Sequence, residues 1–343
     1  MDPLAVMRAL QVAATLSAFG ALLFRAAVAP VALAQVDADV ADRLGRGLAV
    51  IVRASIVAAL AAAAAWLPFQ AAAMSGAGSM GEAMAAVPVV LFETVFGHAL
   101  LLRVVLLAAA LVLFGRGCRP LRSVGAAGLA GVACIAQAGM GHPAAAATLI
   151  LPAAVMAHLL AAGAWLGGLA PLWLTVRRLP RAAAECAARR FSAIGMASVS
   201  VLAATAIVQG WYLLGGVAGI LDTPYGELAQ TKVLLFAALI GLAAVNWRIF
   251  TPNLARDPMA GGHLRRSIAA ETGLGMIVVL AASSMATLPP GSMRMATSDT
   301  SDGARQFAVP MRPAPEKSSA VRPANLVFAS HSAGGRMPCS CTR

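Results

Sequence analysis

Between Arg122 and Arg177 the chain reads SVGAAGLAGVACIAQAGMGHPAAAATLILPAAVMAHLLAAGAWLGGLAPLWLTV (residues 123–176), without one formally charged side chain. A helix needs about 20 mainly apolar residues to cross a bilayer, because each residue rises ~1.5 Å across a core ~30 Å thick. The stretch is long enough for two such helices, and Gly141-His142-Pro143 supplies a turn between them. It therefore predicts a pair of membrane-spanning helices.

The rest of the chain has the same character. Of its 343 residues, 60% are apolar and 12% charged, against about 45–50% and about 25% in soluble domains. This composition excludes an ordinary globular enzyme, a disordered chain and a secreted disulfide scaffold. We expect an all-α, polytopic membrane bundle of eight transmembrane helices, at 7–28, 47–68, 91–114, 122–141, 149–174, 192–214, 228–249 and 268–289.

Arginines between the spans predict the orientation. The connections at 115–122, 176–190 and 248–266 hold three, five and four arginines, and those at 69–90, 140–148 and 215–227 hold none. By the positive-inside rule the Arg-rich connections are cytoplasmic. An even number of spans then places both termini in the periplasm of a bacterial inner-membrane protein.

Other function classes find little support in the sequence. The net charge of +12 lies in short arginine clusters between apolar runs and not on a polar domain, so nucleic acid is not an expected partner. We recognise no serine elbow, phosphate loop or zinc-protease motif, and expect no enzyme. The region 1–290 is expected to form the transmembrane domain, and 291–343 a low-complexity, disordered periplasmic tail.

Three histidines and two methionines fall in the outer half of this topology: His98, Met140, His142, Met156 and His158. Imidazole and thioether together suit copper, since thioether selects Cu(I) and imidazole serves Cu(I) or Cu(II). His142 and His158, with His98 and Met140, therefore form a candidate metal site whose ligand types are compatible with copper. In the alternative interpretation each of these side chains serves packing alone.

Helix geometry limits the supporting residues. Met156 lies ~200° around the helix from His158, so the two cannot point the same way. Trp165 shares a face with His158 and is expected to pack beside the site. Ionisable groups inside a span are functional candidates. Arg103 must find a carboxylate, carbonyls or water inside its span, and Glu93 and Glu271 are the possible acidic partners.

Lys232 stands near the outer end of the seventh expected span. A lysine in such a position usually extends its ammonium toward the interface. We therefore expect it to reach toward Asp222 or Glu227.

Four short segments are informative in their order along the chain. They are Thr94-Val-Phe-Gly97 with Arg103; Gly141-His142 with the alanines that follow; His158 with Trp165-Leu-Gly167-Gly168; and Thr223-Pro-Tyr225-Gly226 with Lys232, Asn246, Arg248 and Pro252. Together they resemble the motifs of the CopD/PcoD copper-resistance membrane proteins. Trp247 departs from the family pattern, in which the asparagine and arginine are adjacent.

The resemblance implies an inner-membrane protein of copper homeostasis that moves copper across the membrane, together with a periplasmic copper-binding partner of the CopC type. A haem-binding electron-transfer protein is the alternative, because His98 and His158 at similar depth could ligate haem axially. A structural or sensory subunit is a third hypothesis.

Overall fold

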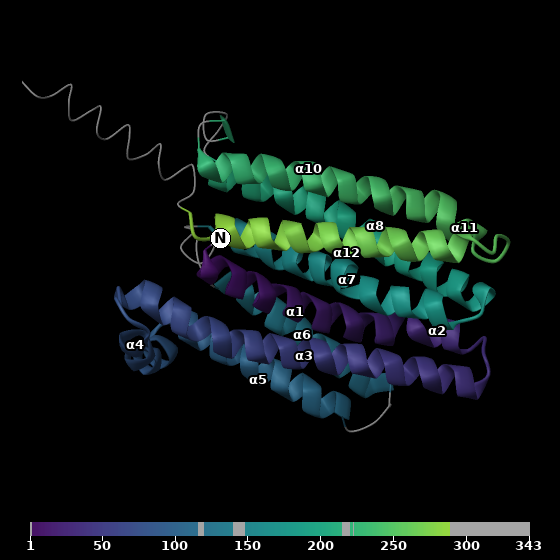
Figure 1. Ribbon diagram of the computed structural model, residues 1–343, viewed down its shortest axis with the longest axis horizontal. Coiled ribbons are helices and arrows are strands. Elements are labelled where there is room, and N and C mark those ends of the chain that lie inside the picture. The colour runs from purple at the N-terminus through teal and green to yellow at the C-terminus, as the bar shows by residue number, and fades with distance from the viewer. Residues whose placement is uncertain (1, 116–119, 140–147, 215–219, 222, 289–343) are drawn as a thin grey trace, which may run out of the picture. The chain divides into compact units, whose positions relative to one another are not determined.

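A computed structural model describes residues 2–115, 120–139, 148–214, 220, 221 and 223–288. Every element within these ranges is helical, and Figure 1 shows the long helices running side by side. The elements are α1 (Pro3–Ala27), α2 (Ala29–Leu33), α3 (Ala38–Ser75), α4 (Met80–Glu93), α5 (Val95–Gly115), α6 (Pro120–Ile135), the 3₁₀ turn η1 (Ala136–Gly139), α7 (Ile150–Arg178), α8 (Arg181–Leu214), α10 (Pro224–Val245), the π-helical turn η3 (Asn246–Phe250), α11 (Thr251–Asn253) and α12 (Ala260–Met285).

Eight helical segments in the described ranges are long and apolar enough to cross a membrane. Each expected span falls on one of them, which confirms the all-α, eight-helix prediction. The sixth to eighth spans begin before the expected residues, at Arg181, Pro224 and Ala260. The expected tail, 291–343, lies outside the described residues.

The arginines gather at one end of the helices. Arg177 and Arg178 end α7, Arg181 begins α8, and Arg265 and Arg266 stand in the first two turns of α12. We call this the Arg-rich end. The other end, where α1 begins and α12 finishes, is called the opposite end.

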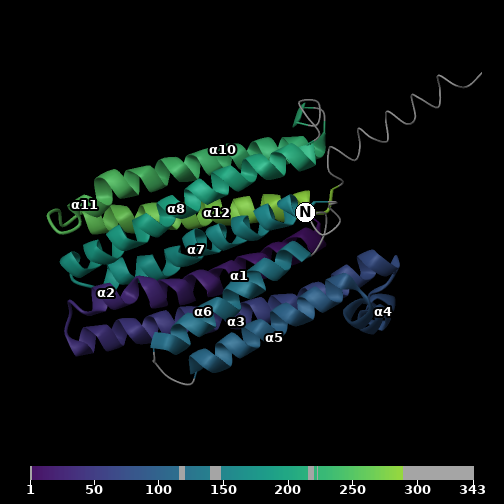
Figure 2. The same cartoon turned by 180° about the vertical axis from the view of Figure 1, so that it is seen from behind.

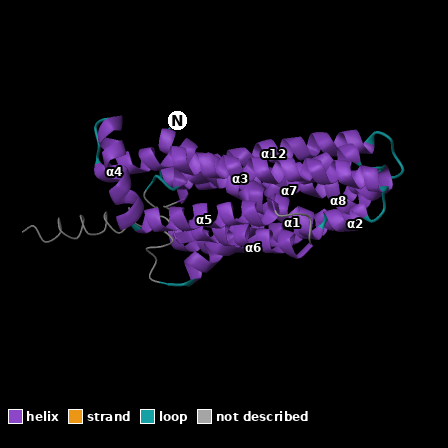
Figure 3. Ribbon diagram, turned by 90° about the horizontal axis from the view of Figure 1, so that it is seen from below, coloured by secondary structure: helices purple, strands orange, loops and turns teal. Residues whose placement is uncertain are grey.

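The helix α4 and its corner with α5 were not expected. The sequence predicts one span over 91–114, but α4 ends at Glu93 and α5 starts at Val95. The Thr94 hydroxyl accepts from the Gly97 amide at 3.0 Å and donates to the Val90 carbonyl at 2.5 Å. A Cβ on Gly97 would lie 2.2 Å from that carbonyl oxygen. The corner therefore requires glycine, and α4 runs across the direction of the long helices (Figures 1 and 3).

Two apolar clusters make up most of the packed interior. One joins residues of α7, α8, α10 and α12 with a few from α1, α2 and α3, and the other joins residues of α1, α3, α5 and α6. Figures 1 and 2 agree that α8 and α10 lie on one side of α1, with α3 and α5 on the other. The described helices therefore form an N-terminal half and a C-terminal half that meet along α1 and α7.

The contact between α1 and α7 depends on three glycines. A Cβ on Gly20 would lie 2.3 Å from the Gly163 carbonyl oxygen, and one on Gly167 would lie 2.0 Å from the Leu16 carbonyl oxygen. Helices in lipid associate by such close approach of small residues, because lipid provides no hydrophobic drive. The Gly163–Gly167 pair therefore packs as a small-xxx-small motif.

Candidate functional site

His158 meets polar side chains from two other helices near the opposite end. Its Nδ1 atom lies 2.9 Å from the Thr205 hydroxyl of α8. Its charge is coupled to that of Lys232 on α10. His158 and Lys232 each stand eight residues from the start of their helices, about 12 Å along the axis. Three helices of the C-terminal half thus contribute to one polar layer.

The Thr205 hydroxyl selects one tautomer of His158. This hydroxyl lies 2.7 Å from the Val201 carbonyl oxygen, to which it donates its proton. Because a hydroxyl has one proton to give, it then accepts from the imidazole Nδ1–H. The Nε2 atom of His158 keeps its lone pair. A neutral imidazole with its Nδ1–H held in this way can bind a metal through Nε2.

Of the two acids expected near Lys232, Glu227 is exposed, and no ion pair joins it to Lys232 in the part of the chain that the structure describes. Asp222 lies outside that part, so a contact with it stays a prediction. Lys232 lies within electrostatic range of His158. Since like charges repel, an ammonium in this position opposes a cation bound at His158.

Trp165 and Met156 have different surroundings. Trp165 is buried and packs edge-on against Phe236 of α10, with ring centroids 6.5 Å apart. Met156, two residues before His158, is 36% exposed. The expectation that Trp165 packs beside a site at His158 stays a prediction.

His98 and Glu93 lie at the α4–α5 corner. Both are exposed, and the His98 Nε2 atom is 2.8 Å from the Phe92 carbonyl oxygen. Helix α5 packs against α3, α4 and α6, while α7 packs against α1, α8 and α12. The structure therefore does not bring His98 and His158 together as the axial pair that the haem alternative needs.

His142 and Met140 lie outside the described residues. Within the described ranges no group of three or more histidine, cysteine or acidic side chains could hold a metal ion. The copper site expected from His98, His142, His158 and Met140 therefore stays a prediction, and His158 is the one of these residues that the structure places in a polar layer between helices.

Arg103 has partners other than the expected acids. Its guanidinium donates to the Gln11 Oε1 atom of α1 at 2.6 Å and to the Gln137 Oε1 atom of η1. Glu93 is exposed at the α4–α5 corner, and Glu271 lies in the C-terminal half. Of the partners that the sequence left open, side-chain carbonyl oxygens of two glutamines are the ones that the structure shows.

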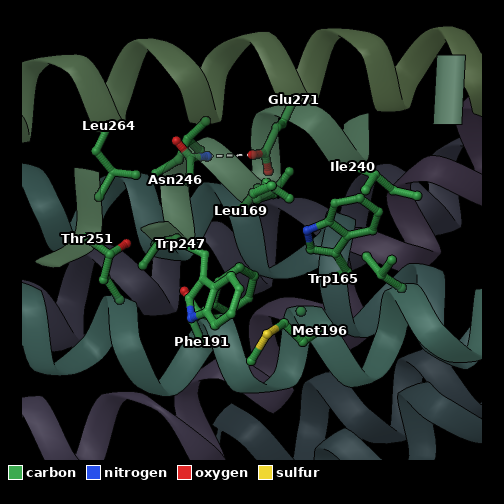
Figure 4. Close-up of a pocket in the computed structure, with 18 of the residues that line it drawn as sticks. Trp165, Leu169, Phe191, Met196, Ile240, Asn246, Trp247, Thr251, Leu264 and Glu271 are labelled. Carbon is green, nitrogen blue, oxygen red and sulfur yellow. Dashed lines mark hydrogen bonds between the residues drawn. The ribbon is translucent and has the colours of Figure 1, made fainter. Parts of the chain in front are cut away.

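A second polar position lies toward the Arg-rich end. Glu271 of α12 is 2% exposed, and its Oε1 atom accepts a hydrogen bond from the Asn246 side chain. Both residues line a cavity of about 310 Å³ between α7, α8, α10, η3, α11 and α12 (Figure 4). The sequence showed Asn246 as part of a motif and Glu271 as an acid in a span, but did not show that the two form a pair.

Thr205 was also missed. It is a small polar residue in an otherwise apolar run, Val201–Val208. Such threonines commonly bond to the carbonyl four residues earlier in their own helix, as Thr205 does. Its second contact, to His158, depends on which helix packs against α8, and the sequence alone does not provide that information.

Comparisons with known proteins agree with this architecture. Residues 1–149 match the model of the copper resistance protein D-like N-terminal domain, and residues 185–285 match the model of copper resistance protein D. The chain belongs to the copper resistance protein D family. Helix α7, which carries His158 and Trp165, lies between the two matched regions of this family member.

Two relatives carry copper-related names. Copper resistance protein D of Pseudomonas syringae pv. tomato is 28% identical over 236 residues, which cover 64% of this chain and 76% of that protein. Copper transport protein CutJ of Bacillus subtilis (strain 168) is 27% identical over 136 residues, 38% of this chain. The matched segment makes up 24% of the length of CutJ. No solved structure matches the chain. These similarities associate this copper resistance protein D family member with copper homeostasis.

Proposed function

We propose that this protein binds copper through His158 at the periplasmic side of the inner membrane and moves it across that membrane. The observation that carries the proposal is the Thr205 hydrogen bond, which leaves the Nε2 lone pair of His158 available in a polar layer between three helices. The family membership and the names of the two relatives supply the identity of the metal.

His142 and Met140 complete the proposed copper site. They precede α7 in the sequence, and they supply an imidazole and a thioether, the ligand types that accept Cu(I). His98 is left out of the site, because it lies at the α4–α5 corner and α5 packs in the N-terminal half, whereas His158 packs in the C-terminal half. A periplasmic copper-binding protein of the CopC type is the proposed donor of the metal.

Lys232 has a role in release under this proposal. Its positive charge beside His158 lowers the affinity for a bound cation. A site that passes its metal onward must bind it weakly enough to let it leave. Lys232 therefore favours the onward transfer of copper from His158 over its retention there.

The test is copper accumulation and copper sensitivity in cells that make the wild type, His158→Ala or His142→Ala. We expect both variants to return accumulation to the level of cells without the protein. The matched control is His263→Ala, because His263 is exposed at the start of α12 and stacks on Phe250. Wild-type accumulation and sensitivity in both variants would rule out the proposed site.

A further inference from the structure

The cavity beside Glu271 is apolar apart from a few residues. Its walls come from α7, α8, α10, η3, α11 and α12 and include Trp165, Leu169 and Phe191 (Figure 4). Glu271 is the single ionisable residue among those that line it. A carboxyl group in such surroundings is costly to ionise unless a partner compensates it. The identity of that partner decides what the cavity can bind.

The side-chain amide of Asn246 uses its N–H₂ group as a donor to Glu271 and leaves its oxygen without a donor. Its Nδ2 group donates to Glu271 Oε1, while its Oδ1 atom is buried and has no hydrogen-bond partner among the residues that the structure describes. Asn246 is 9% exposed and Glu271 is 2% exposed. The pair therefore presents unused acceptor capacity next to a cavity, where a proton or another donor would be stabilised.

An asparagine can serve a carboxyl group in either protonation state. Its N–H₂ donates to the ionised carboxylate, and after rotation of the amide its oxygen accepts from the protonated acid. The buried, open Oδ1 atom of Asn246 is the acceptor that a protonated Glu271 requires. Uptake of a proton forms one O–H bond on the Glu271 carboxyl, and its release returns the proton to water, with no change of oxidation state.

The backbone at Asn246 is also unusual. The α-helix α10 gives way there to the π-helical turn η3, which ends at Phe250. Single π-helical turns inside membrane helices and elsewhere are found frequently at functional sites. Glu271 stands five residues beyond Arg266 on α12, about 8 Å along the axis. The pair thus lies close to the Arg-rich end, which the positive-inside rule assigns to the cytoplasm.

Among the described residues, no charged side chain lines the cavity where it could compensate an ionised Glu271 carboxylate in place of a proton. The charged or titratable residues on the elements that pack against α12 are Arg8 and Arg25 of α1, His158, Arg177 and Arg178 of α7, Tyr225, Glu227 and Lys232 of α10, Arg248 of η3, and, on α12 itself, His263, Arg265 and Arg266. Arg181, Glu185, Arg189, Arg190 and Tyr212 lie on α8, which also borders the cavity. None of these residues lines the cavity.

We propose that Glu271 is a proton-binding site that exchanges its proton with the Arg-rich side, with Asn246 as its partner in both states, and that this exchange drives copper movement. The coupling to copper rests on the proposed function, while the proton site itself does not. In this proposal copper binds at His158, toward the opposite end of the C-terminal half, and the proton binds at Glu271, toward the Arg-rich end.

The proton site is tested without copper. The purified full chain is titrated from acidic to alkaline pH, and the carbonyl stretch of protonated carboxyl groups is followed by infrared difference spectroscopy. We expect a band that disappears on alkalinisation in the wild type and in Glu271→Asp, and that is missing in Glu271→Gln. Glu82→Gln is the matched control, because Glu82 is exposed on α4, and it should retain the band.

A second variant keeps the test decisive if Glu271→Gln does not fold. Asn246→Leu removes the partner of both states and should change the pH at which the band disappears, whereas a band unchanged in Asn246→Leu overturns the proposed pairing. A band that persists in folded Glu271→Gln overturns the proton site itself.

The coupling is tested in liposomes that contain the purified protein. An imposed pH gradient should change the rate of copper uptake severalfold in the wild type and leave it unchanged in Glu271→Gln. Equal sensitivity of both proteins to the gradient overturns the coupling. Absence of copper uptake in the wild type instead contradicts the proposed function, and the infrared result then stands by itself.

Discussion

Two buried ionisable side chains, Arg103 in the N-terminal half and Glu271 in the C-terminal half, differ in the number of hydrogen-bond partners that surround them. Arg103 donates to Gln11 and Gln137 from two different elements and lies 3.4 Å from the Thr15 hydroxyl. Glu271 has one hydrogen-bond partner among the described residues, Asn246, and faces a cavity. A group enclosed by partners holds helices together, whereas a group with one partner and free volume can exchange what it binds.

Removal of the Arg103 side chain should have the largest effect on stability. Arg103→Ala leaves the Gln11 and Gln137 oxygens buried without their charged donor. Each hydrogen bond of that kind contributes about 1.5–3 kcal/mol, so we expect a loss of about 3–5 kcal/mol. Thermal unfolding in detergent measures it, with Arg46→Ala as the control, because Arg46 is exposed near the Arg-rich end. Equal stability of the two variants would contradict the role of Arg103 as a clamp.

The α1–α7 contact should show the next largest effect. Gly20→Ala places a methyl group 2.3 Å from the Gly163 carbonyl oxygen, so the helices must separate. Overpacking of this kind costs about 1–3 kcal/mol. Gly45→Ala is the control, because no atom lies within 4 Å of its Cβ position. The same unfolding measurement should show no loss there, since alanine favours a helix over glycine.

Replacement of Glu271 by glutamine should change stability little. Glu271→Gln keeps the shape of the side chain and a hydrogen bond to Asn246, so we expect a change within about 1 kcal/mol. Unfolding in detergent, compared with Arg103→Ala in the same experiment, measures the difference between the two halves. A loss as large as that of Arg103→Ala would mean that Glu271 is a structural clamp as well.

His98→Ala should have the smallest effect. The His98 ring is exposed and its one hydrogen bond is to a carbonyl at the α4–α5 corner, so a loss of about 0.5 kcal/mol is expected. Copper accumulation in cells should match that of the wild type. Accumulation as low as in His158→Ala would restore His98 to the copper site.

The sequence predicted where the membrane-spanning helices lie along the chain, but not which helices pack against one another. Charge-free apolar runs locate helices directly, because lipid requires them. The α4–α5 corner escaped notice because Thr94 and Gly97 lie within an apolar run and stop the helix through local hydrogen bonds. The sequence analysis placed Thr94 and Gly97 in a motif, but only the structure shows that they form the corner between α4 and α5.

The partners of buried polar groups depend on helix order, which no pattern along the chain reports. For Arg103 the sequence left carboxylates, carbonyls and water open, and the side-chain carbonyls of Gln11 and Gln137 fill that place. In the same way, the expected depth of His98 and His158 suggested a meeting point, whereas in the described ranges α5 packs mainly against α3 and α6, and α7 mainly against α1 and α8. The spans were predictable from the sequence, and the lateral order of the helices was not.

The glycine contact between α1 and α7 lies partway between the two polar positions. Gly163 follows His158 by five residues, and Leu166 touches Gly275, which follows Glu271 by four. Because backbone meets backbone there, a side chain larger than glycine would push α7 away from α1, and α7 is the helix that carries His158 and also lines the Glu271 cavity through Trp165 and Leu169. A tight contact away from both polar positions thus fixes the helix that they share.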